Sequence, residues 1–565
     1  MVHLRATFWL FALALLSPGC GRTAACAEGF AEADGICWPF CAEECGDHQT
    51  CKVTKDTAQC ECVPGYEGNP CKWGGGLVDS EFTDPDAWSS VNGATVSPLA
   101  ATLSGEGIAS FTRGVTCEAS AVSQIVDMPR YEDAEPFVVN MLYRQEGGPG
   151  IEVGYGRARR RLIPRQRAWA VSRFCLGEAA YGGPVKFQVA ATEPPLDCLT
   201  TPESEFSVDS FEIAVAYPGE CPEPGSATNG EANIGEEGWH FYKDLRSGSG
   251  AGTPEFSLEP DVGESGSSGA RLYKPAGVGK RAGVYTHVSV PLPSEANPSP
   301  ALRFWWKASS VFFVSLGTHP VLLTEFEPFD KLVGDGTGKT HTYCLPPWTH
   351  GGVHELTFME QYARAEDTAE LIVDNVEIIS DPRCGESEDL FDPSFDSAPN
   401  RWPGVGIAVE EGSAVTVVDD PERARPPGPG VLELRYASNQ SRLTARTLVW
   451  IPKPEENRGP QLVFHSNVPQ DPGLGVFWTF GVYPNVIPEC TNEDFCQAGW
   501  LNQELPQGGG WRRNAVCLPP TWAERWFLVR FAVRPSDDPY ETFEPPRTVL
   551  LDDFSLGLDE ACPAQ

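Results

Sequence analysis

The feature that most constrains this chain is internal repetition, because one set of motifs occurs three times in the same order. Each copy ends in an alternating apolar stretch with Asp as its second residue: VDSFEIAV from Val208, VDNVEIIS from Val373 and LDDFSLGL from Leu551. Each also carries a cysteine near its middle: SRFCLG at Cys175, HTYCLPP at Cys344 and NAVCLPP at Cys517. Equivalent motifs are nearly evenly spaced, so we predict three tandem copies of one domain.

Between these motifs lie short runs of β-branched and aromatic residues, such as FVVNMLY from Phe137, LRFWW from Leu302 and QLVFHS from Gln461. Pro, Gly, Asn and Asp separate the runs, and helical periodicity is nearly absent. This pattern is typical of an antiparallel sandwich or barrel. We therefore predict an all-β chain: a signal peptide over 1–20, a cysteine-rich segment over 21–75, and β-sandwich copies one to three over 76–221, 222–384 and 385–565.

Cysteines mark the end of each copy. A second cysteine follows each closing stretch, so we predict the disulfides Cys175–Cys221, Cys344–Cys384 and Cys517–Cys562. Each bond would lock the closing strand of its copy. The other cysteines of the repeats are expected to form bonds particular to one copy, Cys117–Cys198 and Cys490–Cys496.

The copies resemble the galactose-binding-domain-like jelly rolls, a group that includes many carbohydrate-binding modules. The resemblance rests on an opening phenylalanine and tryptophan pair and on a closing apolar-Asp-Asp-apolar strand, seen best from Leu551 to Phe554. The copies open at Phe82 to Trp88, Ile234 to Trp239 and Phe395 to Trp402. The resemblance implies a structural calcium ion between an acid after the opening residue and the first closing Asp. That opening position holds Thr83, Gly235 and Asp396, so only copy three pairs an acid, Asp396, with Asp552. No other cofactor is expected.

Glycan recognition is the leading specific function, because sugar sites need flat aromatic faces with polar side chains at their rim. Trp348 and Trp522 follow the repeated cysteine motif on a predicted loop. Trp305, Trp306 and Trp478 lie in predicted strands, where alternation directs one of the adjacent pair outward. The alternative is that the tryptophans fill the core of a structural or protein-adhesive surface component.

The cysteine-rich segment places cysteines at Cys41, Cys45, Cys51, Cys60, Cys62 and Cys71, and it ends in the pattern C-x-C-x-x-G-aromatic. It resembles an EGF-like module, which implies the disulfides Cys41–Cys51, Cys45–Cys60 and Cys62–Cys71. Spacing alone leaves every connectivity open. Cys26 and Cys37 remain and are expected to pair, as Cys26–Cys37.

Residues 1–20 read as an export signal: Arg5 precedes an apolar run from Phe8 to Leu16, and small residues follow. The sequence LLSPGC resembles the lipobox of bacterial lipoproteins, which implies acylation of Cys20 and a lipid anchor at the cell surface or outer membrane. Ser17 departs from that pattern, and cleavage after Gly19, giving a freely secreted chain, is the competing interpretation. Of 19 cysteines, acylated Cys20 would leave an even number for disulfides.

The net charge of −36 argues against nucleic acid as a partner. The partners we expect are extracellular glycans or surface proteins. The run from Arg157 to Arg167 is the basic exception, and it could bind an anionic polysaccharide, dock on an acidic neighbouring copy or form a charged strand edge. The chain has no GxSxG, HExxH or GxxxxGK[ST] motif, and with 78 acidic residues a glycosidase pair carries no information. We expect no enzyme, with a glycoside-active site grafted on a repeat as the distant alternative.

Overall fold

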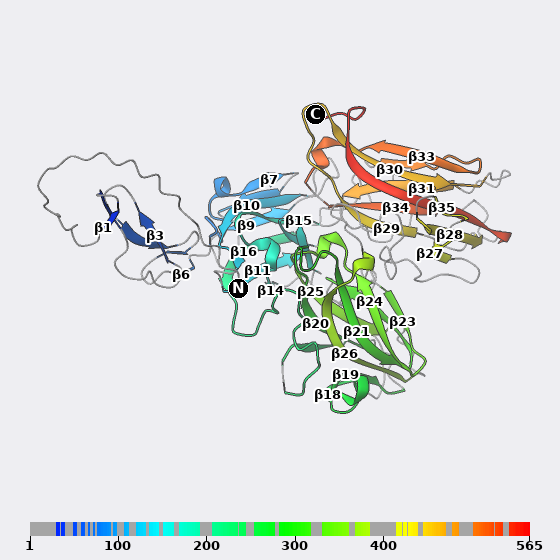
Figure 1. The fold of residues 1–565 in the computed structure, drawn as a ribbon, viewed down its shortest axis with the longest axis horizontal. Coiled ribbons are helices and arrows are strands. Elements are labelled where there is room, and N and C mark those ends of the chain that lie inside the picture. Colours follow the sequence, from blue (N-terminus) through cyan, green and yellow to red (C-terminus); the bar gives the residue numbers. More distant parts are fainter. Residues whose placement is uncertain are drawn as a thin grey trace, which may run out of the picture. The chain divides into compact units, whose positions relative to one another are not determined.

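The computed structural model describes most of residues 30–564, and the chain divides into two units, Met1–Lys72 and Trp73–Gln565 (Figure 1). The stretches of five or more residues outside the described residues are 1–29, 40–48, 99–106, 112–119, 146–150, 163–168, 192–205, 244–252, 277–281, 318–329, 361–367, 385–413, 439–443, 470–476, 485–500 and 535–541. No helix in the described part is long and apolar enough to cross a membrane.

The described part of the first unit, up to its boundary with the second, forms three two-stranded sheets, of which the first two are antiparallel. They are β1 (Phe30–Ala33) with β2 (Ile36–Pro39), β3 (Gln49–Val53) with β4 (Ala58–Cys62), and β5 (Tyr66–Glu67) with β6 (Lys72–Trp73). Cys60 is disulfide-bonded. The other cysteines of this unit, with Cys20, lie outside the described residues or have side chains that are not described. The EGF-like pairing therefore stays a prediction.

Copy one of the second unit is a sandwich of two five-stranded antiparallel sheets. One sheet has the order β13 (Ala158–Leu162), β12 (Ile151–Tyr155), β15 (Gly183–Ala191), β10 (Ala121–Met128), β7 (Ser89–Val91). The other has the order β14 (Ala170–Cys175), β11 (Phe137–Gln145), β16 (Phe206–Val215), β9 (Ile108–Phe111), β8 (Ala94–Ser97).

Copy two repeats both strand orders. Its first sheet runs β23 (Asp330–Val333), β22 (Val311–Leu316), β25 (Val353–Glu360), β20 (Ala282–Ser289), β17 (Trp239–Lys243). Its second sheet runs β24 (Gly338–Cys344), β21 (Pro300–Ala308), β26 (Ala369–Ser380), β19 (Gly269–Lys274), β18 (Glu255–Glu259).

Copy three repeats them again. Its first sheet is described as β32 (Leu501–Glu504), β31 (Phe477–Pro484), β34 (Trp526–Arg534), β29 (Thr444–Trp450). Its second sheet runs β33 (Trp511–Cys517), β30 (Gly459–Asn467), β35 (Thr542–Asp559), β28 (Gly430–Ser438), β27 (Ala414–Asp419). The predicted all-β fold of tandem antiparallel sandwiches is confirmed, and in every copy the closing strand, β16, β26 or β35, is the middle strand of its sheet.

The core of copy two shows how the period-two pattern builds these sandwiches. Val284 and Phe358 from one sheet meet Phe304 and Leu371 from the other, and all four are fully buried. Alternate residues of each strand point inward, so the apolar half of the pattern fills the space between the sheets.

One ion pair interrupts this apolar interior. Lys274 of β19 and Glu360 of β25 share the inward register, and Lys274 Nζ lies 2.6 Å from Glu360 Oε1. Their side chains are 1% and 6% exposed, so the pair joins the two sheets in a region that excludes water. Mutual attraction offsets the cost of burying the two charges.

The structure contains the disulfides Cys175–Cys221, Cys344–Cys384 and Cys517–Cys562, the three pairs expected from the repeats. Each ties the strand that carries the mid-copy cysteine to the segment just after the closing strand. Cys117, Cys198, Cys490 and Cys496 lie outside the described residues.

The start of copy two differs from the sequence expectation. Trp88 Nε1 donates to the Asp79 carbonyl and Trp239 Nε1 to the Asn229 carbonyl, each at 2.8 Å, so the tryptophans are equivalent. The buried residue before Trp239 is Ala232, at φ 49°, matching Phe82 at φ 55°.

Ile234 is 56% exposed, so pairing it with Trp239 as the opening of copy two was wrong. The side chain of Asn229 fixes the turn by accepting from the Asn233 backbone N at 2.7 Å. This makes Asn233, not Gly235, the equivalent of Thr83.

Candidate functional site

Two of the tryptophans proposed as sugar platforms are core residues. Trp306 is 1% exposed and belongs to the copy-two core. Trp522 is 8% exposed and stacks on Phe527 with ring centroids 4.4 Å apart. Neither ring offers a face to a ligand.

Trp348 is half-buried and packs against residues of another copy. Its ring lies 6.1 Å from that of Trp526, which lies 5.3 Å from Trp450. Trp526 Nε1 donates to the Arg157 carbonyl at 2.7 Å, and the Arg157 guanidinium sits 5.2 Å from the Trp450 ring centroid. Arg157, the first arginine of the basic run, therefore contacts an aromatic cluster of another copy. Docking on a neighbouring copy was one of three interpretations of the run, but the expected neighbour was acidic.

Trp305 is half-exposed and points to the outer face of the sheet of β18, β19, β26, β21 and β24. It packs so closely over Gly338 that a Cβ there would lie 2.4 Å from its ring. Arg303 and Glu377 form a 2.6 Å ion pair on the same strands, so this face is charged and hydrated. The side chain of Trp478, in β31, is not among those described.

The closing Asp of copies two and three holds a loop. Asp552 is nearly fully buried, and its Oδ2 accepts from Arg425 N at 2.9 Å while its Oδ1 accepts from Asp553 N at 2.7 Å. Asp374 does the same with Glu264 N and Asn375 N. Asp396 lies outside the described residues, and within the described part no group of three His, Cys, Asp or Glu side chains could hold a metal ion.

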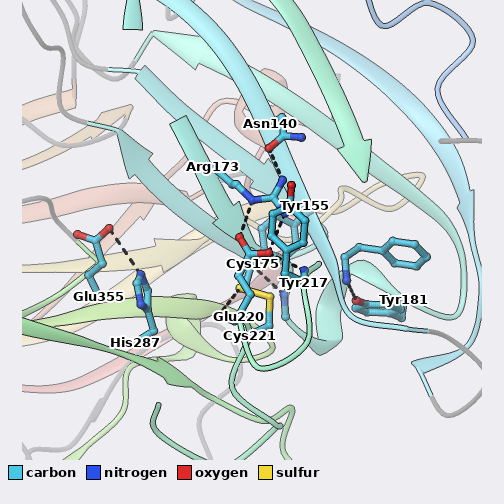
Figure 2. The surroundings of a disulfide bond; sticks show 12 residues. Asn140, Tyr155, Arg173, Cys175, Tyr181, Tyr217, Glu220, Cys221, His287 and Glu355 are labelled. Atoms are coloured by element: carbon cyan, nitrogen blue, oxygen red, sulfur yellow. Dashed lines mark hydrogen bonds and ion pairs between the residues drawn. A yellow bond between two sulfur atoms is a disulfide. The ribbon is translucent and has the colours of Figure 1, made fainter. Parts of the chain in front are cut away.

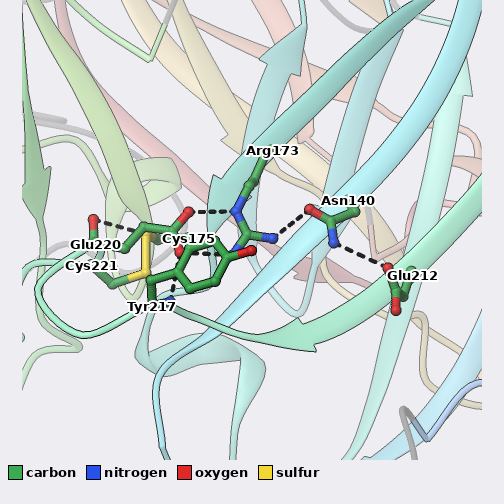
Figure 3. A network of polar contacts seen from close by, with 7 residues as sticks. All are labelled: Asn140, Arg173, Cys175, Glu212, Tyr217, Glu220 and Cys221. Carbon is green, nitrogen blue, oxygen red and sulfur yellow. Dashed lines mark hydrogen bonds and ion pairs between the residues drawn. A yellow bond between two sulfur atoms is a disulfide. The ribbon is translucent and has the colours of Figure 1, made fainter.

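A polar network surrounds the first closing disulfide (Figures 2 and 3). Arg173 donates to Glu220 Oε2 at 2.7 Å and to Asn140 Oδ1 at 2.7 Å, and its guanidinium lies 4.8 Å from the Tyr217 ring centroid. Burial opposes ionisation of Glu220, but the hydrogen bonds from Arg173 and from the Tyr217 backbone outweigh it and lower the Glu220 pKa. The network and the bond Cys175–Cys221 together fix the turn after β16.

The strongest candidate site lies on the outer side of the copy-two sheet of β17, β20, β25 and β22. Alternate residues there point away from the core residues Val284, Leu356 and Phe358. We call this set of outward side chains the polar face: His240, Tyr285, His287, Ser315, Glu355 and Thr357.

Three aromatic rings form one compact cluster on the polar face. His240 stacks on Tyr285 with centroids 4.8 Å apart and an interplanar angle of 25°. His287 meets His240 edge-on at 5.7 Å and Tyr285 edge-on at 6.0 Å. His240 is exposed and the other two are half-buried, so the cluster meets solvent at His240.

Hydrogen-bonding groups adjoin the rings. Glu355 is 5% exposed, and its Oε1 lies 4.0 Å from His287 Nε2, a pair drawn in Figure 2. The hydroxyls of Ser315 and Thr357 are fully buried in paired positions on β22 and β25, and neither has a hydrogen-bond partner in the described structure. Desolvation lowers the pKa of His240, against the opposing fields of Glu355 and Glu237, so the ring is neutral near pH 7.

Sequence reasoning missed the polar face. The only signal was the placement of His, Tyr, Thr and Glu at alternate positions in the apolar runs VYTHVS and VHELTF. Alternation predicts outward side chains but not which two strands lie side by side. The sheet order brings Tyr285 beside His240 and His287 beside Glu355.

No protein-family model matches this chain, and no curated protein sequence does either. Among solved structures it is similar to the N-terminal tandem CBM22 domains of Paenibacillus barcinonensis Xyn10C, at 14% identity, covering 54% of this chain and 97% of that one, with a TM-score of 0.19. A family 11 carbohydrate-binding module of a Clostridium thermocellum cellulosomal cellulase is 16% identical, with coverages of 28% and 97% and a TM-score of 0.18.

A structure described as the triple jelly-roll fold and turret assembly of an archaeal virus is 9% identical. The match covers 83% of this chain and 90% of that one, with a TM-score of 0.19. Because identity and TM-score are low in all three cases, the function of this chain has to rest on its own residues.

Proposed function

We propose that this chain is an exported, non-catalytic binding protein that holds a sugar ring on the polar face of copy two. The observation that carries the proposal is the aromatic cluster of His240, Tyr285 and His287 directly beside the carboxylate of Glu355. Sugar recognition requires this combination, since the apolar face of a pyranose stacks on an aromatic ring while its hydroxyls need partners.

The roles follow from exposure and chemistry. His240 and Tyr285 would contact ring C–H groups. The Glu355 carboxylate would accept hydrogen bonds from sugar hydroxyls, and a ring nitrogen of His287 would donate one. Charge-assisted bonds to a carboxylate are stronger than neutral ones, so Glu355 would contribute most of the polar recognition.

The rest of the chain serves display in this proposal. Disulfides in all three copies fit an oxidising, extracytoplasmic compartment. Residues 1–20 would direct export, acylated Cys20 would tether the chain to a membrane surface, and the EGF-like segment 21–75 would space the sandwiches from it. Calcium bound by Asp396 and Asp552 would be a structural feature of copy three.

A second candidate function, a structural or protein-adhesive surface component, is favoured by the tryptophans. Trp522 is buried within copy three, so its loop packs within one sandwich. Trp348 packs on Trp526 of another copy, so the equivalent loop of copy two packs between sandwiches. In that case the polar face would bind no sugar.

A glycan array probed with the full mature chain separates the two functions. The His240→Ala/Tyr285→Ala double variant tests the polar face, and Trp305→Ala, an outward aromatic on the other sheet, is the matched control. We expect the unmodified chain to bind a sugar on the array. The double variant should bind that sugar at least about tenfold more weakly, and the control should bind it as tightly as the unmodified chain. Equal binding by all three proteins would exclude the polar face, and no binding by the folded chain would favour the structural component.

A further inference from the structure

The three copies of the second unit contact one another through elements that recur in each copy. One is the loop that follows the mid-copy cysteine, which we call the junction loop: 176–182 in copy one, 345–352 in copy two and 518–523 in copy three. The other is the closing disulfide, which starts at the residue before that loop. In copies one and two, both elements contact the next copy along the chain.

The junction loop of copy one is adapted to the approach of copy two. Ala179 N donates to the Gly351 carbonyl O at 2.9 Å, and a Cβ on Gly177 would collide with that same oxygen. The other copies carry Pro346 and Pro519 at the position of Gly177. Copy one therefore departs from the repeat at the point where only glycine leaves room for its neighbour.

Both closing disulfides of the first two copies pack against the next copy. Cys175 of copy one forms one buried cluster with Val353 of copy two. Cys344 and Cys384 of copy two belong to the buried cluster that forms the core of copy three. Domains joined by flexible linkers move relative to one another unless an apolar interface holds them, and both junctions here are apolar.

Trp526 of copy three lies outside the core of its own sandwich. It stands opposite Trp450 on the paired strands β34 and β29. The adjacent residues Phe527 and Val449 fill the core, so alternation directs both tryptophans to the outer face of the sheet. A tryptophan on a free sheet surface would be exposed, yet Trp526 is only 6% exposed.

The other two copies cover Trp526. The ring of Trp348, from the junction loop of copy two, lies 6.1 Å from it. Arg157, in the turn between β12 and β13 of copy one, accepts from Trp526 Nε1 at its carbonyl and places its guanidinium 5.2 Å from the Trp450 ring centroid. Copy one thus contacts copy three directly as well as through copy two.

We propose that the three sandwiches form one rigid body, held by a closed set of three contacts between copies that share Trp526. In a closed set each contact is kept formed by the other two, because they hold its partners at high effective concentration. Opening one contact should therefore loosen the others, which flexibly joined domains would not show. Surfaces carried on different copies would then keep fixed distances from one another.

Two N–H groups report on these contacts because their acceptors lie in another copy. The Ala179 amide donates from copy one to copy two, and the Trp526 indole donates from copy three to copy one. Hydrogen exchange of both groups is measured by NMR in the full chain. In the unmodified chain each should exchange at least about tenfold more slowly than the same group in the unfolded chain.

The first variant opens the contact between copies one and two. Gly177→Ala places a Cβ against the Gly351 carbonyl, and it should speed exchange of the Trp526 indole at least about threefold. Gly557→Ala is the matched control, since a Cβ there would meet no atom within 4 Å and should change neither reporter.

The second variant acts from copy three. Trp450→Ala removes the ring beneath the Arg157 guanidinium and should speed exchange of the Ala179 amide at least about threefold. Trp305→Ala, an outward tryptophan of copy two, is its control. Small-angle X-ray scattering should show a larger radius of gyration for the full chain in both variants and in neither control, because released copies sample wider separations.

Backbone amides of β11, β21 and β30 monitor the folding of each copy and should stay protected. If one variant loses this protection, the other, which changes a different copy, still decides. Fast exchange of both reporters in the unmodified chain would overturn the proposal. Variants that disturb only the contact next to the substitution, with an unchanged radius of gyration, would also overturn it, because the copies would then be joined pairwise and move independently.

Discussion

The buried ion pair of copy two allows a sharp test of how its two sheets are held together. Replacing Lys274 by Met removes the ammonium and leaves the carboxylate of Glu360, 6% exposed, without the charge that lies 2.6 Å from it. Breaking a buried pair from one side costs about 3–5 kcal/mol, because the remaining charge stays desolvated. The double variant Lys274→Met/Glu360→Leu removes both charges and keeps the volume, so its stability should fall within about 1 kcal/mol of the parent or exceed it.

Amide hydrogen exchange in the full chain reports the effect on one sandwich at a time. In Lys274→Met the protection of β19 and β25 should fall by about a hundredfold or more, since each tenfold change corresponds to about 1.4 kcal/mol. The strands β11 and β30, in the other copies, are internal controls and should not change. If the single and double variants lose equal protection, the two charges act independently and the account of the pair as a coupled unit is wrong.

Three further predictions concern stability. Replacing Cys344 and Cys384 by Ser opens a loop of 40 residues and should cost copy two about 4 kcal/mol, seen as faster exchange in β26. Trp522→Ala should destabilise copy three by about 3–5 kcal/mol in thermal unfolding, whereas Trp305→Ala, on an outer face, should cost less than about 1 kcal/mol. Desolvation lowers the pKa of His350 to about 4. The unfolded chain, with a His pKa near 6.5, then binds more protons than the folded one below that pH. Copy two should lose up to about 3 kcal/mol of stability between pH 6.5 and 4 and nothing above 6.5, and His350→Asn should flatten that part of the pH profile.

The repeats made much of the fold predictable. A pattern shared by three segments is unlikely to arise by chance, so the alternation around Val208, Val373 and Leu551 predicted a strand in each copy, and the structure places one at each position. The same logic gave the three closing disulfides. Covalent and periodic signals of this kind are local in sequence, which is why they can be read without a structure.

The candidate site was less accessible, because its residues depend on contacts between distant segments. Trp348 and Trp522 follow the same motif, yet one packs on another copy and the other fills its own core. Ile234 resembles Phe82 in sequence, but a turn fixed by the Asn229 side chain places Ala232 in the buried position. Predicting the polar face required the strand order of copy two, which pairs His240 with Tyr285, His287 with Glu355 and Ser315 with Thr357. These partners are tens of residues apart in the sequence, and composition does not reveal which segments pair.

The position of β16, β26 and β35 in the middle of their sheets has a consequence for how the chain is made. During synthesis from the N-terminus, β18 and β19 have no partner to join them to β21 and β24 until β26 emerges. Each sandwich therefore stays split until its last segment arrives, and a chain ending just before that segment loses the whole sandwich. The closing stretches of the three copies are alike. The unfilled middle position of one sheet could therefore also accept the closing strand of another copy. A disulfide from each closing segment to its own copy would retain only the correct pairing.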